Sequence, residues 1–207
     1  NEEDIPDTIL FILQISTRRE SSPNGPDDYG YICFDDTDED WDQAPEYNWV
    51  EINPNERNPD FRGEELPGNR RDNLASEVEL PFEFQYYGEQ YNHIAISENG
   101  FIAMGEDMDL LKQYENFPLD MIINGSLGMI APYWDDLKIR VGDANIYTFY
   151  DDDGHTFIIQ WQELGFVNGG NGRVTFEVIL FDPAYFPSVS GDGSFLIQYK
   201  TVPDPIR

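Results

Sequence analysis

The stretch Asn145-Ile-Tyr-Thr-Phe-Tyr-Asp-Asp-Asp-Gly-His-Thr-Phe-Ile-Ile-Gln-Trp161 carries the clearest indication of the fold. Side chains alternate in character over residues 145–150, which is typical of a half-buried strand, and residues 156–161 form an apolar run typical of a buried strand. The tetrapeptide Asp151-Asp152-Asp153-Gly154 between them consists of turn-forming residues. The stretch therefore predicts a β-hairpin.

Segments of the same kind recur on both sides of this hairpin, separated by turn residues, whereas only residues 108–114 could form a short helix. A second tight turn is predicted at Glu98-Asn99-Gly100, because Asn-Gly supplies the positive φ that such a turn requires. We therefore expect an all-β protein, an antiparallel, jelly-roll-like β-sandwich with long loops and little helix. The predicted strands comprise residues 9–16, 29–34, 48–52, 76–83, 93–97, 101–104, 129–133, 144–150, 156–163, 173–181 and 194–201.

The 207 residues are enough for one large domain or two small ones, and we expect one. Residues 1–24 are predicted to form an N-terminal strand or linker segment, and residues 25–207 a single β-sandwich module. Residues 53–73 are rich in proline, glycine and arginine and lack an apolar period, so we expect a loop or a covering flap there. The apolar faces expected to build the core are Phe82/Phe84, Ile94/Ile96, Ile158/Trp161 and Phe176/Val178/Leu180.

The composition excludes several kinds of partner. Acidic residues outnumber basic residues 41 to 12, which gives a formal net charge of -29 and a pI near 4.1. A phosphate backbone would be repelled, so nucleic acid is excluded as a partner. The apolar runs are far shorter than the roughly 20 residues that cross a bilayer, and no membrane insertion is expected. The single Cys33 rules out an internal disulfide but leaves the compartment open.

The run Asp35-Asp36-Thr37-Asp38-Glu39-Asp40-Trp41-Asp42 is a candidate metal site. Carboxylates this close together stay ionised only when they are solvated or gathered around a cation, and calcium takes six to eight oxygen ligands from such loops. The run is not an EF-hand, because Trp41 stands where that loop requires glycine and Tyr47 where it requires glutamate. The alternative is a solvated acidic loop.

A second acidic pair, Asp135-Asp136, follows an apolar strand directly. Its ordinary role would be to cap a turn through backbone N–H groups, and its alternative role is metal ligation. Neither acidic group alone supplies a full calcium shell. We therefore predict Ca²⁺ bound between the two loops, with Asp35, Asp36, Asp38, Asp135 and Asp136 as ligands.

Catalytic signals are weak. Cys33, His93 and His155 are the side chains suited to nucleophilic or acid–base chemistry near neutral pH, and no catalytic motif surrounds them. Cys33 lies in an alternating strand, where a buried packing role is expected. A glycosidase needs only two carboxylates, so paired acids leave that alternative open. A sugar-stacking surface is a further alternative to core packing for five aromatic residues: Tyr86, Tyr87, Tyr91, Trp134 and Trp161.

Four groups of motifs occur in order over residues 25–207. They are Gly25-Pro-Asp-Asp-Tyr-Gly-Tyr31 with Ala44-Pro-Glu-Tyr-Asn-Trp-Val-Glu-Ile52; Val78-Glu-Leu-Pro-Phe-Glu-Phe-Gln-Tyr-Tyr-Gly88 with Ile96-Ser-Glu-Asn-Gly-Phe-Ile102; Ile130-Ala-Pro-Tyr-Trp-Asp-Asp-Leu137; and Phe157-Ile-Ile-Gln-Trp161 with Phe176-Glu-Val-Ile-Leu180 and Ile197-Gln-Tyr199. Together they resemble the β-sandwich accessory modules of large bacterial secreted or surface proteins, including those appended to subtilisin-like and gingipain-type proteases. More distantly, they resemble the nidogen-type extracellular domain.

The resemblance implies a non-catalytic extracellular or cell-surface module that acts in adhesion, assembly or ligand binding. Members of the family continue with another strand after the segment that corresponds to Ile197-Gln-Tyr199. We therefore expect this module to be cut short, or to be completed by a partner or a neighbouring domain. The implied partners are other extracellular proteins, neighbouring domains of the parent chain and glycans. A carbohydrate-binding module and a glycoside hydrolase remain the alternatives.

Overall fold

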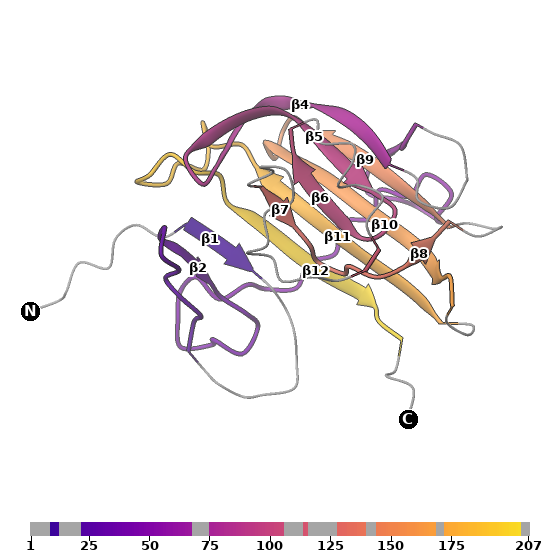
Figure 1. The fold of residues 1–207 in the computed structure, drawn as a ribbon, viewed down its shortest axis with the longest axis horizontal. Helices are drawn as coiled ribbons and strands as arrows, with labels where there is room; N and C mark the ends of the chain where they lie inside the picture. The colour runs from indigo at the N-terminus through magenta and orange to yellow at the C-terminus, as the bar shows by residue number, and fades with distance from the viewer. Residues whose placement is uncertain are drawn as a thin grey trace, which may run out of the picture.

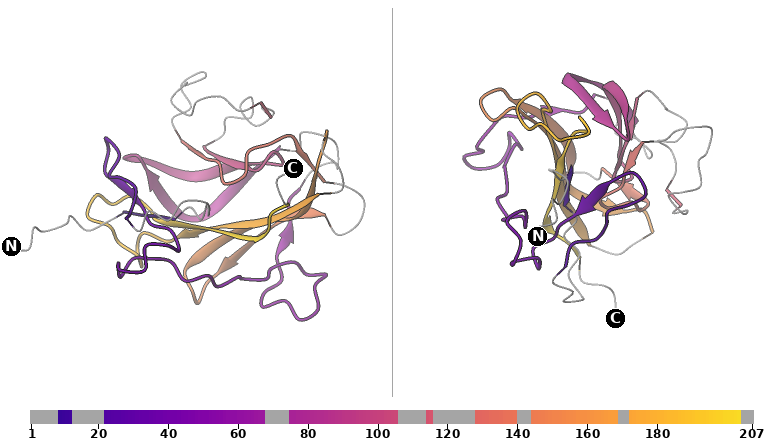
Figure 2. Two further views of the ribbon diagram at one scale, coloured as in Figure 1. Left: turned by 90° about the horizontal axis from the view of Figure 1, so that it is seen from below. Right: turned by 90° about the vertical axis from the view of Figure 1, so that its left-hand side faces the viewer.

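The hairpin predicted from residues 145–161 lies in the larger of two sheets, next to the edge strand β3. Strand β9 (Asn145–Asp151) pairs antiparallel with β10 (Thr156–Phe166), and Tyr150 lies opposite Phe157. The computed structural model describes residues 9–12, 22–67, 75–105, 114–115, 128–139, 144–168 and 172–203. The two sheets pack face to face, which confirms an all-β sandwich (Figures 1 and 2).

The larger sheet has the strand order β2-β1-β12-β11-β10-β9-β3, and β8 pairs with the end of β10. Its pairings are antiparallel except at one edge, where β1 runs parallel to both β12 and β2. The sequence predicted no parallel pair. The other strands of this sheet are β1 (Ile9–Ile12), β2 (Tyr31–Cys33), β3 (Glu64–Glu65), β8 (Leu137–Lys138), β11 (Arg173–Phe181) and β12 (Phe195–Thr201).

The smaller sheet has the order β4-β5-β6-β7. Its β5–β6 connection is the predicted Asn-Gly turn, in which Gly100 has a φ of 81° and a Cβ would overlap the carbonyl oxygen of Tyr133. The pairing of β4 with β5 is interrupted by an irregularity between Glu79 and Phe84. The strands are β4 (Ala75–Tyr86), β5 (Glu89–Ser97), β6 (Phe101–Met104) and β7 (Met129–Ile130).

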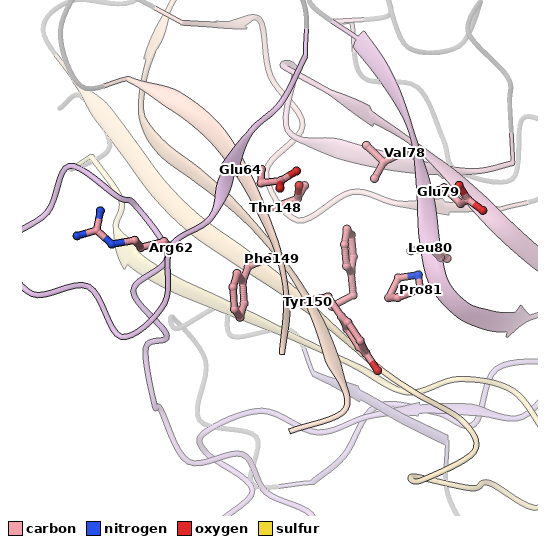
Figure 3. A pocket seen from close by; sticks show the side chains of 10 residues that line it. Arg62, Glu64, Val78, Glu79, Leu80, Pro81, Thr148, Phe149 and Tyr150 are labelled. Atoms are coloured by element: carbon pink, nitrogen blue, oxygen red, sulfur yellow. The ribbon is translucent and has the colours of Figure 1, made fainter. Parts of the chain in front are cut away.

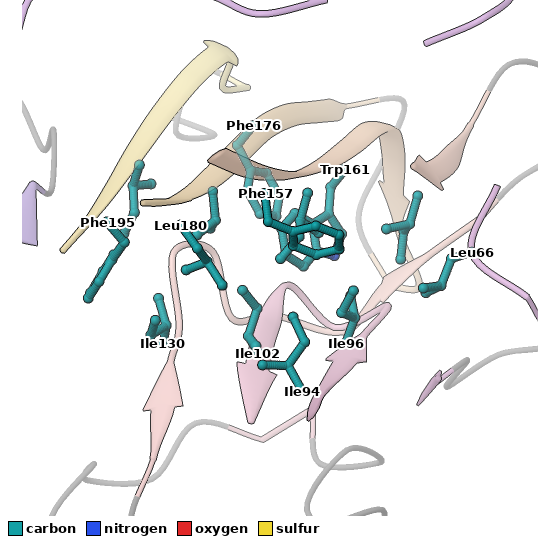
Figure 4. Close-up of a cluster of buried hydrophobic side chains, with 14 of the residues drawn as sticks. Leu66, Ile94, Ile96, Ile102, Ile130, Phe157, Trp161, Phe176, Leu180 and Phe195 are labelled. Atoms are coloured by element: carbon teal, nitrogen blue, oxygen red, sulfur yellow. The ribbon is translucent and has the colours of Figure 1, made fainter. Parts of the chain in front are cut away.

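The main core lies between the two sheets, and Figure 4 shows isoleucines of the smaller sheet facing the aromatic rings of the larger one. The predicted core is confirmed with one correction. Ile158 is buried, but it lies on the outer face of the larger sheet with Ile52 and Tyr147. Side chains alternate across a strand, so Ile158 cannot share a face with Trp161, which is three residues away. The confirmed members are Phe84, Ile94, Ile96, Trp161, Phe176, Val178 and Leu180, with Phe82 packed against them.

Residues 48–52, predicted as a strand, instead form an extended crossing segment on the outer face of the larger sheet (Figure 2). Every second backbone N–H donates to a side chain of the sheet below. These bonds run from Asn48 to Gln198 Oε1 (2.7 Å), from Val50 to Glu177 Oε1 (3.2 Å) and from Ile52 to Gln160 Oε1 (3.0 Å). The three acceptors are cross-strand neighbours on β12, β11 and β10. The strand prediction was wrong because side chains, not a strand ladder, satisfy the alternating N–H groups.

The short helix predicted at residues 108–114 lies outside the described residues except for Tyr114. The predicted loop at residues 53–73 contains the two-residue strand β3 and is otherwise irregular up to Pro67, where its described part ends. No helix in the described part of the chain is long and apolar enough to cross a membrane.

Candidate functional site

The motif Gly25-Pro-Asp-Asp-Tyr-Gly-Tyr31 folds around a single carboxylate. Asp27 Oδ1 accepts hydrogen bonds from the backbone N–H groups of Tyr29 (3.0 Å), Gly30 (2.7 Å) and Tyr31 (2.9 Å). Gly30 has a φ of 130°, which a residue with a side chain rarely adopts. The motif is therefore a tight turn that fixes the directions of two tyrosine side chains.

Those tyrosines meet the tip of the β4–β5 hairpin. The rings of Tyr29 and Tyr87 lie 5.1 Å apart, and the hydroxyl of Tyr87 donates to Asp27 Oδ2 at 2.6 Å. The hydroxyl of Tyr29 donates to Asp192 Oδ2 at 3.0 Å. Tyr29 is 44% exposed and Tyr87 is 38% exposed, so each hydroxyl is held by a carboxylate while part of the ring faces solvent.

Asp192 joins three separate segments at this point. It is fully buried, and its Oδ1 accepts the backbone N–H of Gly88 at 2.8 Å while its Oδ2 binds Tyr29. The β11–β12 loop that carries Asp192 is also tied to β4, because Gln85 Nε2 donates to the carbonyl of Ser190 at 3.1 Å. Figures 1 and 2 show this loop, the hairpin tip and residues 22–34 gathered at one end of the sandwich.

The surroundings shift the pKa values of Asp27, Tyr29 and Tyr87. Burial raises the pKa of Asp27, but hydrogen bonds from Tyr87 and from three backbone amides outweigh it and leave the pKa below its ordinary value. Burial and then the bond to Asp27 raise the pKa of Tyr87, and burial and the bond to Asp192 raise the pKa of Tyr29. Both tyrosines therefore remain hydroxyl donors at neutral pH.

The same β11–β12 loop exposes further apolar side chains. Tyr185 stacks on His155 of the β9–β10 turn with ring centroids 3.3 Å apart. Carboxylates of Asp28, Glu89 and Asp152 are exposed on the neighbouring turns. We call the exposed apolar set the aromatic end, and it consists of Tyr29, Tyr87, Tyr185, Phe186 and Val189.

A groove of about 620 Å³ opens between the two sheets, at the edge where β4 of the smaller sheet faces β9 and β3 of the larger (Figure 3). Leu80 and Phe157, which line it, are buried members of the main core. The groove therefore opens from the surface onto the main core between the two sheets. Its lining consists of Arg62, Glu64, Val78, Glu79, Leu80, Pro81, Thr148, Phe149, Tyr150 and Phe157.

One carboxylate pair has the opposed environments of a catalytic acid and base. Burial raises the pKa of Glu177 to about 8. Burial also raises the pKa of Glu51, but hydrogen bonds, first from Lys200, outweigh it and leave that pKa below its ordinary value. Glu177, however, is fully buried beneath the crossing segment, and neither residue lines the groove. The pair fastens the crossing segment to the sheet.

The acidic run after β2 forms a loop closed by its own carboxylates. Asp35 Oδ1 accepts the backbone N–H of Thr37 at 2.8 Å, and Asp38 Oδ2 accepts the N–H of Asp35 at 2.9 Å. Asp38 is only 2% exposed, and its Oδ1 has no hydrogen-bond partner among the described residues. Asp36 lies in the same loop.

Asp135 and Asp136 form part of a turn between β7 and β8. Asp135 Oδ1 accepts the N–H of Asp136 at 2.7 Å, and Asp136 Oδ2 accepts Asn168 Nδ2 at 3.4 Å. Figure 1 shows the β2 loop and β8 at opposite sides of the molecule. In the ranges that the structure describes, no group of three or more His, Cys, Asp or Glu side chains could hold a metal ion. The structure thus does not bring the two predicted halves of the calcium site together.

Cys33, His93 and His155, for which no catalytic role was predicted, lie on three different elements. Cys33 is half-buried in β2, and its backbone pairs with Asn24. His93 on β5 contacts Asn92 and Glu77, and His155 stacks on Tyr185.

Of the two alternatives for the five aromatic candidates, core packing holds for four of them. Tyr86, Trp134 and Trp161 are buried, and Tyr91 packs against the main core. Tyr87 alone among the five is exposed. Tyr29 was not among the candidate residues predicted from the sequence, although the Asp-Asp-Tyr-Gly pattern is a local turn signal. No local signal connects Tyr29 to Asp192, which lies 163 residues further along the chain.

Comparison with known proteins gives one family. A family model described as NIDO related matches residues 58–184. The match includes the whole smaller sheet and the groove, and it includes Tyr87 but not Tyr29. No solved structure matches the chain.

Proposed function

The chain belongs to the NIDO-related family of nidogen-like extracellular modules, and on that premise we propose that it is a non-catalytic module of a larger secreted or cell-surface protein, acting in adhesion or assembly. The resemblance to modules appended to secreted proteases supports the accessory role. The single observation that carries the proposal is the aromatic end, where tyrosine rings are exposed while their hydroxyls are held by carboxylates.

When an interface forms on such tyrosines, their side chains lose little conformational freedom. Tyrosine is enriched among the residues that contribute most to protein–protein binding, because it combines a large apolar ring with a polar tip. The bonds to Asp27 and Asp192 fix Tyr87 and Tyr29 before binding, so the entropic cost of ordering these side chains is already met in the free module.

Charge indicates the kind of partner. The module carries a formal charge of -29, and exposed carboxylates of Asp28, Glu89 and Asp152 lie on the turns around the aromatic end. Such a surface repels a second copy of itself and attracts a basic surface. The proposed partner is therefore another extracellular protein, or a neighbouring domain of the parent chain, with lysine and arginine side chains at the contact.

We also propose that calcium stabilises the acidic run. The buried and unpartnered Asp38 Oδ1 supports an ion at the loop that contains Asp35 and Asp36, with backbone carbonyls and water completing the shell. Asp135 and Asp136 would then bind a separate ion or serve only their turn.

The proposed function is tested by capture experiments with purified module on beads, exposed to the extracellular proteins of its natural source. Three proteins are compared: the wild type, the double variant Tyr29→Ser/Tyr87→Ser, and the control Tyr47→Ser, whose tyrosine is 52% exposed outside the aromatic end. We expect a basic protein that the wild type and the control retain and the double variant loses. Its purified form should bind the double variant at least about thirtyfold more weakly, and salt should weaken the wild-type complex. Equal retention by all three proteins would contradict the proposal.

A further inference from the structure

We propose that the groove between β4 and β9 is a second binding site and that its ligand is a neutral oligosaccharide. This site is separate from the aromatic end and does not depend on the protein partner assigned there. Its volume of about 620 Å³ lies within the roughly 300–1,000 Å³ typical of ligand pockets.

The open edge of β4 does not favour an added peptide strand. Pro81 lies at the groove and has no backbone N–H to donate, and the β4–β5 ladder is interrupted between Glu79 and Phe84. Glu77, Glu79 and Glu83 place exposed charges along the same strand. Proline, irregularity and charge are the features that protect an edge strand from pairing, so the occupant is a ligand that uses side chains.

The lining offers what a pyranose ring requires. Tyr150 on β9 lines the groove, is half-buried and packs against the main core, and its apolar ring surface suits the C–H face of a sugar. Its neighbour Phe149 packs on the outer face of the larger sheet, where it stacks on Phe61 with ring centroids 4.8 Å apart. Glu64 and Thr148 lie beside each other at one end of the groove (Figure 3). The carboxylate accepts from sugar hydroxyls, and the threonine hydroxyl both donates and accepts.

The charge of the groove selects against acidic glycans. Glu64 and Glu79 are exposed at its rim, and the molecule as a whole carries -29. Arg62 is the one basic residue in the lining. A uronic acid or a sulfated sugar would therefore be repelled on approach, whereas a neutral glycan would not.

The test uses the folded module and a panel of neutral hexasaccharides: cello-, xylo-, manno-, laminari- and chitohexaose, with isothermal titration as the readout. We expect binding of at least one of them. Glu64→Gln combined with Thr148→Val should raise the Kd about tenfold or more, since two hydrogen bonds to the sugar are lost. The matched control is Glu65→Gln on the same strand, which does not line the groove, and it should leave the Kd unchanged.

Two results would overturn the glycan site. One is that no hexasaccharide in the panel binds. A fluorescent fatty-acid probe that binds when the hexasaccharides do not would likewise rule out a glycan as the ligand. The other is that Glu64→Gln/Thr148→Val binds as tightly as the wild type. Tyr29→Ser/Tyr87→Ser should retain full glycan affinity, so the failure of one site is distinguishable from the failure of the other.

Discussion

Glu177 is the residue whose chemistry depends most on its position in the fold. It lies fully buried on β11, where its Oε1 accepts the N–H of Val50 and the Nε2 of Gln198 at 2.8 Å. Burial raises its pKa to about 8, and the neighbouring charge of Glu51 adds to the rise, while the hydrogen bonds and Lys200 act in the opposite direction. The side chain is therefore mainly protonated at pH 7, and this neutral form holds the crossing segment.

This assignment predicts a loss of stability as pH rises. The folded-state pKa of about 8 lies above the ordinary value of 4.5, so between these values the folded protein binds more protons than the unfolded chain. The stabilisation from neutral Glu177 is fully present below pH 4.5 and is lost as pH rises through 8. Urea unfolding at pH 5, 7 and 9 should show this decline, and Glu177→Gln, which imitates the neutral carboxyl, should flatten it. If the free energy of unfolding falls equally with pH in the wild type and in Glu177→Gln, a group other than Glu177 titrates.

At the scale of elements, the sequence could predict those that depend on local patterns but not those that depend on contacts between distant residues. The hairpins at residues 145–161 and at Asn99-Gly100 are confirmed, because alternation and turn residues act over a few positions. The crossing segment was mistaken for a strand, since its acceptors on Gln160, Glu177 and Gln198 lie 108, 127 and 150 residues away. The parallel pairing of β1 is equally nonlocal.

The same distinction applies to the candidate site: its local turn could be predicted from the sequence, and its long-range contacts could not. The sequence contained the Asp27 turn as a local motif, and Tyr87 was one of five aromatic candidates that the sequence did not distinguish from one another. It could not predict that Asp192 would hold Tyr29 and Gly88 together, nor that β4 and β9 would leave a groove between them. Both features arise from the packing of elements that are far apart along the chain.

Asp192 connects three loop elements, and we expect its removal to loosen all of them. Asp192→Ala leaves the hydroxyl of Tyr29 and the N–H of Gly88 without their acceptor, which should lower the free energy of unfolding by about 1–3 kcal/mol. Hydrogen exchange should accelerate at residues 29–31 and 86–88. Asp153→Ala, at an exposed position of the β9–β10 turn, should change stability by no more than about 0.5 kcal/mol. Similar losses in both variants would argue against a connecting role for Asp192.

For the loop after β2, the calcium proposal predicts a stabilisation that chelation removes. An ion that binds only the folded protein adds about 2.7 kcal/mol at a hundredfold excess over its Kd. The melting temperature should fall when calcium is chelated and should recover poorly with magnesium. Asp38→Asn should weaken the response, because it alters the buried carboxylate. If isothermal titration of chelated protein detects no binding at millimolar calcium, the run is a solvated acidic loop.

At the scale of the whole molecule, the charge of -29 makes the folded state repel itself. Monovalent salt shortens the range of this repulsion, from roughly 30 Å at 0.01 M to about 3 Å at 1 M. The melting temperature should therefore rise with sodium chloride over this range, measured by circular dichroism in the presence of a chelator so that calcium does not contribute. A melting temperature that does not change with salt would mean that the carboxylates are already compensated within the fold.

The proposed function requires that the aromatic end be the surface through which this module contacts a protein partner. The most direct measurement places the photo-crosslinking residue p-benzoylphenylalanine at position 87 of the parent protein, and separately at the control position 47, in its natural extracellular setting. We expect a crosslinked adduct from position 87 with another extracellular protein or a neighbouring domain, mapped by mass spectrometry to a basic surface, and no such adduct from position 47. The absence of an adduct at position 87, or equal adducts from both positions, would contradict it.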